Sequence, residues 1–279
     1  MTKGNVYASS DWHGCYDVGM KVLNFLKPED TLYFIGDVID RGPRSIDLLK
    51  EMVKRPNVIM LAGNHEEMMI NAMPSYKAFR DDFNQKNWTV TDESYEWLDN
   101  WNWNGGQATQ RQLDEMSPQE INELFYILNS KMYNKSLTYI TKQEDTIILE
   151  HAGFTPGLPN IKHDPLWDRS HFYDNWSKED FAQKIYIVHG HTPVPYLQYS
   201  YGYKGDDLVK KDATYFKERR DWINNSVCNN PQVLRYCEGH KFDVDMCTIV
   251  TNTIALLNLD TFETIYFKGD NKNEENLRN

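Results

Sequence analysis

Three apolar, strand-like runs near the start of the chain constrain the fold more than any other feature. They cover residues 5–9, 31–35 and 58–61, and each is followed by a polar loop and then by a helix-like run. Strands that alternate with helices form parallel β–α–β units, whose right-handed crossovers bring the loops to one edge of the sheet. The pattern therefore predicts an α/β fold with three polar loops on one edge.

Each of these loops carries side chains that can bind ions. The loops read Ser10-Asp11-Trp12-His13-Gly14, Gly36-Asp37-Val38-Ile39-Asp40-Arg41-Gly42 and Gly63-Asn64-His65-Glu66. Two later strand-like runs, residues 146–150 and 185–188, end in His151-Ala152-Gly153 and His189-Gly190-His191, and Asp164-Pro165-Leu166-Trp167-Asp168-Arg169 lies between them. Loops at strand ends are common places for ligands, because a rigid sheet fixes the side chains there.

The residue types on these loops predict a metal centre. Imidazole and carboxylate together suit Mn, Fe or Zn, whereas oxygen ligands alone would favour Mg or Ca. The candidates are more numerous than one metal requires, and two metals that share a bridging carboxylate fit their number. A pair of metals is a known arrangement for phosphoryl displacement. The histidines outside this pattern, His163, His171 and His240, are interpreted as structural, and His189 as a hydrogen-bonded core residue.

Composition excludes several other classes of protein. The net charge of −11 argues against nucleic acid as the main partner. No apolar run is long enough to cross a bilayer and the N-terminus has no signal-peptide core, so we expect no membrane span and a cytoplasmic protein. The four cysteines have no Cys-x-x-Cys spacing and are interpreted as free thiols.

We predict a single domain over residues 1–270, followed by a polar tail at 271–279. Residues 73–130 are expected to form a helical cap, with a helix that starts at Ser117-Pro118-Gln119-Glu120. The cap is rich in tryptophan (Trp88, Trp97, Trp101 and Trp103), which is interpreted as core packing. Residues 196–240 form an elaboration with seven basic and six acidic residues, either a solvated surface segment or a substrate-binding lid. The end of the chain, 248–267, predicts two or three strands.

The loop motifs resemble those of the phosphoprotein phosphatases, calcineurin-like metallophosphoesterases that include bacterial and phage serine/threonine phosphatases. The family signatures are Gly-Asp-x-His-Gly, Gly-Asp-x-x-Asp-Arg-Gly and Gly-Asn-His-Glu, and the chain has them in this order, with Ser10 in place of the first glycine. The resemblance covers residues 5 to about 195 and resumes weakly near Phe242 to Tyr266. It implies a β–α–β core with two packed sheets flanked by helices. The family's Asp-Thr-Gly stands here as Asp245-Met246-Cys247. Residues 196–240 do not align with the family, so the resemblance implies nothing about substrate selection.

The resemblance also implies a role for each site residue. Asp11 and His13 would bind one metal, with Asp37 as the bridge, and Asn64, His151 and His191 would bind the second. Two divalent ions are implied, Mn²⁺ first, with Fe or Zn as alternatives. A hydroxide between them would attack phosphorus, and His65, oriented by Asp40, would act as general acid. Arg41 and Arg169 would bind phosphate oxygens.

Three functions are compatible with these motifs. The first is a phosphomonoesterase that acts on phosphoserine or phosphothreonine in proteins. The second is a symmetrical dinucleoside tetraphosphate hydrolase of the same superfamily, whose members typically replace the second Asp of the central motif; Asp40 therefore favours the phosphatase. The third is a non-catalytic, metal-stabilised scaffold for phosphorylated partners, but such a scaffold would be expected to lose a ligand or the acid, and the sequence retains both.

Overall fold

The computed structural model describes residues 4–80, 91–132, 134–154, 163–172, 184–204, 207–210 and 230–270. Nearly half of the segment considered as a lid, residues 205–206 and 211–229, lies outside these ranges, as do Trp88 and the polar tail. No helix in the described ranges has both the length and the apolar character that a membrane span requires.

The first sheet contains the three predicted parallel strands. Its order is β12-β11-β1-β2-β3, in which β1, β2 and β3 are parallel and β11 is antiparallel to β1. The strands are β1 (Val6–Ser9), β2 (Thr31–Phe34), β3 (Val58–Met60), β11 (Thr253–Asn258) and β12 (Thr264–Lys268). The end of the chain thus supplies the antiparallel edge of the sheet that the N-terminus begins.

The second sheet carries the later histidine motifs. Its order is β4-β5-β6-β10-β9, and β5, β6 and β10 are parallel. The strands are β4 (Ser136–Ile140), β5 (Thr146–Glu150), β6 (Ile185–His189), β9 (Leu234–Tyr236) and β10 (Lys241–Asp243). A separate hairpin of β7 (Tyr201–Lys204) and β8 (Asp207–Lys210) follows the short helix α8 (Val194–Ser200).

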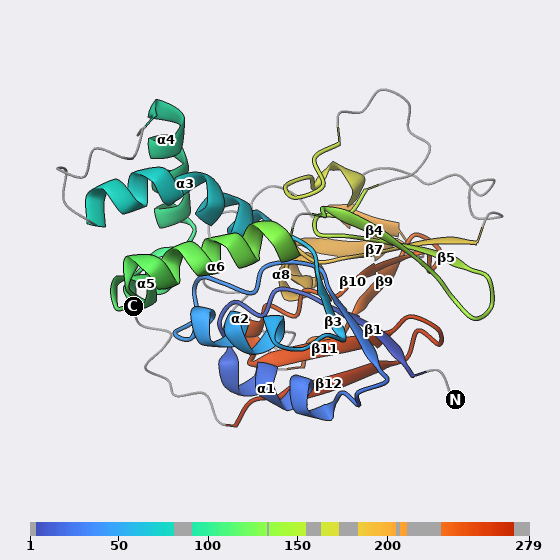
Figure 1. Ribbon diagram of the computed structural model, residues 1–279. Helices are drawn as coiled ribbons and strands as arrows, with labels where there is room; N and C mark the ends of the chain where they lie inside the picture. The colour runs from blue at the N-terminus through green and yellow to red at the C-terminus, as the bar shows by residue number, and fades with distance from the viewer. Residues whose placement is uncertain are drawn as a thin grey trace.

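The two sheets pack face to face, because alternate residues of their inner strands are apolar. Val6 and Ala8 of β1 share a buried cluster with Ile147 and Leu149 of β5 and with Val188. The opposite face of the first sheet is covered by α1 (Tyr16–Phe25) and α2 (Ser45–Val53), whose apolar stripes belong to a second cluster (Figure 1). The predicted class, an α/β fold with two packed sheets flanked by helices, is confirmed.

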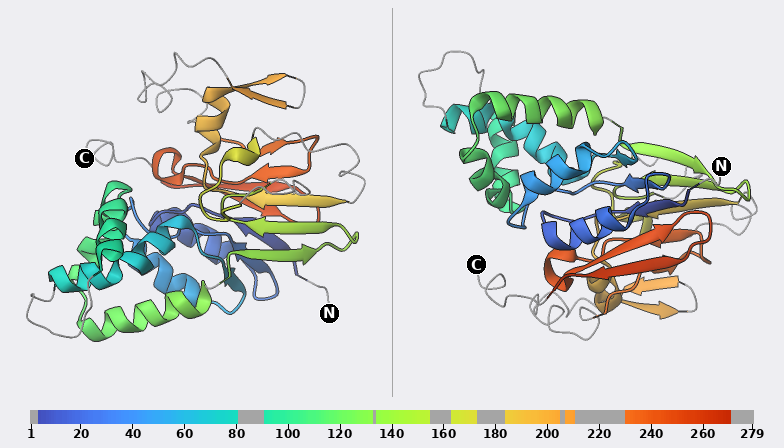
Figure 2. Two further views of the ribbon diagram at one scale, coloured as in Figure 1. Left: turned by 90° about the horizontal axis from the view of Figure 1, so that it is seen from above. Right: turned by 60° about the horizontal axis from the view of Figure 1, so that its bottom comes forward.

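Four helices gather at one end of the sheets (Figure 2). They are α3 (Asn64–Arg80), α4 (Asp92–Trp103), α5 (Gln107–Asp114) and α6 (Pro118–Lys131). The predicted start of α6 is confirmed, since Ser117 and Glu120 form a capping box with Pro118 at the first helical position. The remaining short helices are η1 (Ser170–Phe172) and α10 (Thr248–Thr251).

Two interpretations of the sequence need correction. Residues 248–251 form α10 and not a strand, so strand pairing begins only at Thr253. Trp103 is not a packing residue: 91% of its surface is exposed, whereas Trp101 is fully buried. The difference follows from helix geometry, because residues two positions apart point to opposite sides of a helix.

Candidate metal centre

The five predicted loops meet at one edge of the two sheets. Backbone hydrogen bonds join neighbouring loops: Asp11 N–H donates to Gly36 O at 3.0 Å, His13 N–H to Asp37 O at 3.1 Å, and Gly190 N–H to His151 O at 2.9 Å. This is the edge where parallel strands end, so the predicted convergence of the loops is confirmed.

The loops hold an unusual backbone conformation at the predicted site residues. Six of the ten residues expected to act in the site have positive φ angles between 42° and 71°. They are Asp11, His13, Asp37, Asp40, Arg41 and His191. A left-handed conformation is unfavourable for residues other than glycine, and such strain is concentrated at functional sites.

The Glu66 carboxylate fixes two of these loops. Its Oε2 accepts hydrogen bonds from the backbone N–H groups of Asp37 at 2.8 Å and Gly63 at 2.9 Å. Its Oε1 accepts from Val38 at 2.9 Å and more weakly from Ile39 at 3.3 Å. The side chain is fully buried, and burial raises its pKa to about 7. Glu66 stands in a motif that the sequence analysis quoted, but no role was predicted for it.

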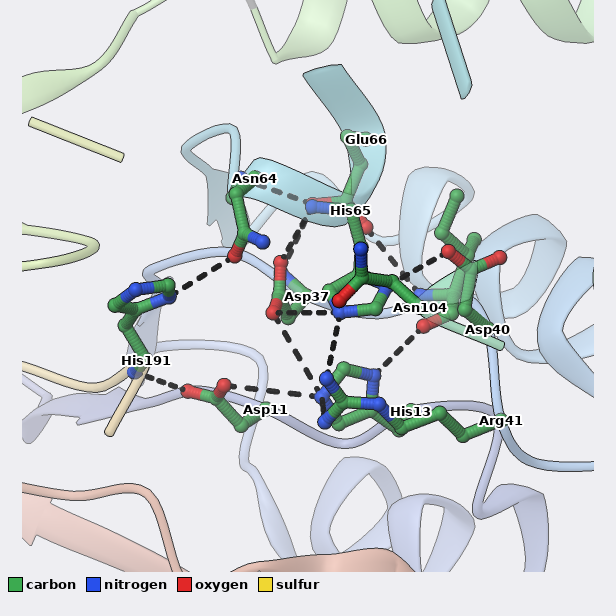
Figure 3. A network of polar contacts seen from close by, with 12 residues as sticks. Asp11, His13, Asp37, Asp40, Arg41, Asn64, His65, Glu66, Asn104 and His191 are labelled. Carbon is green, nitrogen blue, oxygen red and sulfur yellow. Dashed lines mark hydrogen bonds and ion pairs between the residues drawn. The ribbon is translucent and has the colours of Figure 1, made fainter. Parts of the chain in front are cut away.

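Asp37 lies at the middle of the cluster (Figure 3). Its Oδ2 is 3.5 Å from His151 Nε2, 3.7 Å from His13 Nε2 and 3.8 Å from His65 Nε2. Asp37 belongs to both groups of side chains whose atoms could hold a metal ion. These groups are His13–Asp37–His65 and Asp11–Asp37–His151.

The other predicted ligands surround this carboxylate. Asn64 Oδ1 lies 3.0 Å from both His151 Nε2 and His191 Nδ1. Asp11 accepts a hydrogen bond from the His191 backbone N–H at 3.1 Å, and its other oxygen is 3.8 Å from His13 Nε2. All six residues expected to bind metal are therefore buried at one place.

Backbone carbonyls orient two of the histidines. His13 Nδ1 is 2.9 Å from Ile39 O, and His151 Nδ1 is 2.8 Å from Ile35 O. A carbonyl oxygen can only accept, so Nδ1 of each ring carries a proton and Nε2 faces the Asp37 carboxylate. An Nε2 atom oriented in this way is suited to binding a metal.

The charges of the site also fit a bound cation. Burial raises the pKa of Asp11 to about 6. Burial would lower the pKa of His151, but the nearby Asp37 and Asp11 carboxylates outweigh it and raise this pKa to about 10. Both effects show carboxylates held together away from water, where a divalent ion would neutralise them. The nitrogen and oxygen donor set therefore fits Mn, Fe or Zn.

A buried imidazole–carboxylate pair lies beside the cluster. His65 Nδ1 is 2.7 Å from Asp40 Oδ2, and this oxygen also accepts from Trp101 Nε1 at 2.8 Å. The second oxygen of Asp40 accepts from the Thr109 hydroxyl at 2.5 Å. Burial raises the pKa of Asp40 to about 7, although the hydrogen bonds from Thr109 and Trp101 oppose the shift. Neither Trp101 nor Thr109 was predicted in this role, since they lie 61 and 69 residues from Asp40.

The two predicted phosphate-binding arginines occupy different positions. The exposed Arg41 places Nη1 2.8 Å from His13 Nε2 and Nη2 2.8 Å from His65 Nε2. A guanidinium can only donate, so Nε2 of His65 accepts and Nδ1 is the protonated atom that donates to Asp40. Arg169 Nε donates to the Thr192 hydroxyl at 3.1 Å, beside His191. The roles of these residues in phosphate binding remain predictions.

The histidines interpreted as structural have partners in the fold. His189 Nε2 is 2.6 Å from the Tyr236 hydroxyl and both are buried, which confirms a core role for His189. His163 pairs with Glu150, and His240 Nδ1 is 2.8 Å from Ile185 O. Cys15, Cys237 and Cys247 form no disulfide with one another, and Cys228 lies outside the described residues.

Comparison with known proteins gives relatives of two kinds. Serine/threonine-protein phosphatase 1 of Salmonella typhimurium is 26% identical over 198 residues, which are 68% of this chain and 79% of the relative. The symmetrical bis(5'-nucleosyl)-tetraphosphatase of Legionella pneumophila is 24% identical over 245 residues, 84% of this chain and 68% of the relative. A solved serine/threonine phosphatase from Saccharomyces cerevisiae, described as similar to human phosphatase PP5, aligns with a TM-score of 0.49 at 14% identity over 98% of this chain and 82% of that chain.

A comparison with protein families matches residues 4–241 to the family described as calcineurin-like phosphoesterase. The match covers most of the chain and includes every loop of the metal centre. It confirms the resemblance that the loop motifs indicated. The chain belongs to the calcineurin-like phosphoesterase family.

Proposed function

We propose that the protein is a two-metal phosphatase that hydrolyses phosphoserine and phosphothreonine in proteins. The observation that carries the proposal is the buried His65–Asp40 pair beside Asp37, with 2.7 Å between His65 Nδ1 and Asp40 Oδ2. A metal centre with an adjacent oriented imidazole has the parts required to cleave a phosphate ester with an alcohol leaving group.

The side chains around Asp37 that could hold an ion group as His13 with His65 and as Asp11 with His151, and the proposed division of the ligands follows the resemblance to the family. Asp11 and His13 would hold one ion, Asn64, His151 and His191 the other, and Asp37 would contact both. When bound, two divalent ions clamp the attacking and leaving oxygens of a phosphoryl displacement and lower the pKa of bound water. The mixture of imidazole and oxygen donors supports Mn²⁺ as the first choice, with Fe or Zn as alternatives.

The side chains of this protein supply the proton and the binding of phosphate. In the resting arrangement His65 Nε2 accepts from Arg41, so it would first take up a proton from solvent when Arg41 turns to the phosphate. It would then deliver this proton to the leaving oxygen of serine or threonine, while Asp40 holds Nδ1 and so fixes the plane of the ring. Arg41, which reaches the same Nε2 atom, would bind the phosphoryl oxygens next to this proton donor. Arg169 would contact the phosphate from the His191 side of the centre.

A second candidate is symmetrical hydrolysis of dinucleoside tetraphosphates. A relative with this name, from Legionella pneumophila, aligns with 84% of the chain. The leaving group would then be a nucleoside diphosphate, which requires less help from a general acid than an alkoxide does. Trp101 and Thr109 both donate hydrogen bonds to Asp40 and so fix the partner of the predicted general acid, His65. A well-positioned general acid supports the first candidate, because the alkoxide leaving group needs one more.

One assay separates these candidates. The protein is loaded with Mn²⁺ and given a phosphoserine peptide, diadenosine tetraphosphate and an aryl phosphate side by side, with the His65→Asn variant in parallel. We expect the largest kcat/KM for the phosphopeptide. A larger kcat/KM for diadenosine tetraphosphate would select the second candidate. Metal binding without turnover of any of the three would favour a phosphoprotein-binding scaffold.

A further inference from the structure

Trp103 is an exposed aromatic residue at the C-terminal end of α4. Its surface is 91% exposed, and the fold of the described residues gives it no packing role. Leaving an indole in water forgoes the stabilisation that burial would provide. Tryptophan is enriched at surfaces that contact other molecules, because its indole combines an apolar body with one N–H donor.

The turn that follows Trp103 touches the predicted phosphate-binding arginine. Arg41 N–H donates to Gly105 O at 3.1 Å. A Cβ placed on Gly105, whose φ is +96°, would come within 3.0 Å of Arg41 Cγ, so the main chain of the turn packs directly on this side chain. Asn104, the residue between Trp103 and Gly105, is drawn beside His65 and Arg41 in Figure 3. Trp103 is therefore linked through Asn104 to the turn that borders Arg41, although its own side chain leaves α4 on the side away from Asp40.

Trp103 also lines a cavity that opens to solvent. The cavity has a volume of about 620 Å³ and is lined by Asp99, Asn100, Asn102, Trp103 and Gln107. Two of the amide oxygens are already used within the fold: Asn100 Oδ1 accepts from Asn104 Nδ2, and Asn102 Oδ1 accepts from Gln110 Nε2. The indole, the Gln107 amide and the Asp99 carboxylate remain to face a ligand. No ion pair to Asp99 occurs within the described ranges.

All charged side chains of α4 are acidic. The helix contains Asp92, Glu93, Glu96 and Asp99 but no Lys or Arg. Asp92, Glu96, Asp99 and Trp103 follow one another at intervals of four, three and four residues, so they lie on one face of the helix. Acidic residues in the first turn stabilise a helix, but Asp99 lies toward the C-terminal end, where negative charge is unfavourable. Helix stability therefore does not account for Asp99.

We propose that the cavity beside Trp103 binds a Lys or Arg side chain that flanks the phosphorylated residue of a protein substrate. The cation would lie over the indole face and pair with the Asp99 carboxylate, while the phosphate reaches Arg41 and the metal centre. This inference rests on the proposed phosphoprotein phosphatase activity and adds a preference for basic sequences around the phosphorylated residue.

Charge distinguishes this ligand from a nucleotide. A nucleobase could also stack on an exposed tryptophan. Its adjoining phosphates would then lie near Asp99 and the acidic face of α4, and like charges repel. A basic peptide segment satisfies both the aromatic and the acidic groups, so the observations favour it.

Three phosphoserine peptides that differ only in the flanking residue test the proposal. The residue is Lys, Ala or Glu, and kcat/KM is measured for each peptide and for an aryl phosphate. We expect the order Lys, Ala, Glu, with a preference for Lys that weakens as salt is raised. Trp103→Ala and Asp99→Asn should each reduce the ratio of the Lys peptide to the Ala peptide by about two- to fivefold, the usual scale of one exposed cation–π contact or ion pair.

Two further variants serve as controls. Trp103→Phe keeps an aromatic face and should retain most of the preference for Lys. Tyr126→Ala removes an aromatic residue of 74% exposure from α6, and should leave the ratio unchanged. Thermal unfolding of each variant establishes that it is folded.

The outcomes separate this inference from the proposed function. Equal kcat/KM for the Lys and Ala peptides, or a ratio that Trp103→Ala leaves unchanged, would overturn the basic-residue site and leave the phosphatase standing. A Trp103→Ala variant impaired mainly on diadenosine tetraphosphate would show base stacking and overturn the inference. Absence of activity on all phosphopeptides, with turnover of diadenosine tetraphosphate, would overturn both.

Discussion

Nδ1 of His65 lies 2.7 Å from Oδ2 of Asp40, and both side chains are buried. The pair joins the start of α3 to the loop after β2, two segments that also provide Asn64 and Asp37 to the metal centre. A displacement of this pair would therefore move the predicted proton donor relative to the predicted metal ligands. The predictions below begin with this pair.

His65→Asn should lower kcat for a phosphoserine peptide by roughly two orders of magnitude or more, which is the usual contribution of a general acid. Metal content, measured by elemental analysis, should stay at the wild-type level. Asp40→Asn should lower kcat in the same direction, because Asn cannot accept from Trp101, Thr109 and His65 together. Unchanged turnover in His65→Asn would refute the acid role.

Asp37→Asn should impair the binding of both metals. The Oδ2 atom of Asp37 lies within 3.8 Å of His13, His65 and His151, so one carboxylate serves both possible ion positions. Metal stoichiometry after dialysis measures the effect. Asp17→Asn, at a highly exposed side chain, is the matched control and should retain full metal content. Two retained metals in Asp37→Asn would contradict the bridging position.

Glu66→Gln should destabilise the fold. One carboxylate accepts four backbone hydrogen bonds from two loops, and a Gln side chain would turn an N–H₂ group toward two of the donors. The loss is expected to be roughly 2–3 kcal/mol of unfolding free energy, as for a buried charged hydrogen-bonding group. Urea unfolding measures it. Glu29→Gln, at an exposed position, should give the wild-type curve, and an equal curve for Glu66→Gln would contradict the loop-fixing role.

The pH dependence of stability should include a contribution from Asp260, which is remote from the site loops in sequence and pairs with β4. Burial acts to raise the pKa of Asp260, but hydrogen bonds from Lys142 and Tyr139 outweigh it and hold the pKa below the ordinary value of 3.8. A lowered folded-state pKa stabilises the protein above the unfolded value, and this stabilisation is lost as the pH falls through the folded-state pKa.

Asp260→Asn should therefore cost about 2 kcal/mol near pH 7, the scale of a charge-assisted hydrogen bond, and progressively less below pH 4. Unfolding curves of the two proteins between pH 3 and pH 7 measure the difference. Asp270→Asn removes the exposed partner of Lys21 and should change stability little at any pH. A difference that grows as the pH falls would reverse the predicted sign.

The sequence alone determined the parallel strands, the loops at their ends and the residue types of the metal centre. These features depend on local patterns: apolar runs of strand length, helical periodicity and motifs that interrupt them. The loops then meet because parallel β–α–β units place strand ends on one edge, a rule that does not depend on the details of packing.

Only the tertiary structure decided how those loops are held. Glu66 contacts backbone groups up to 29 residues away, and Trp101 and Thr109 reach Asp40 across more than 60 residues. Such contacts depend on how helices pack against strand ends, which a local pattern does not encode. Trp101 and Trp103 look alike in the sequence, yet Trp101 is buried against Asp40 and Trp103 is exposed on the opposite side of α4. Only packing determines which side of this helix faces the core.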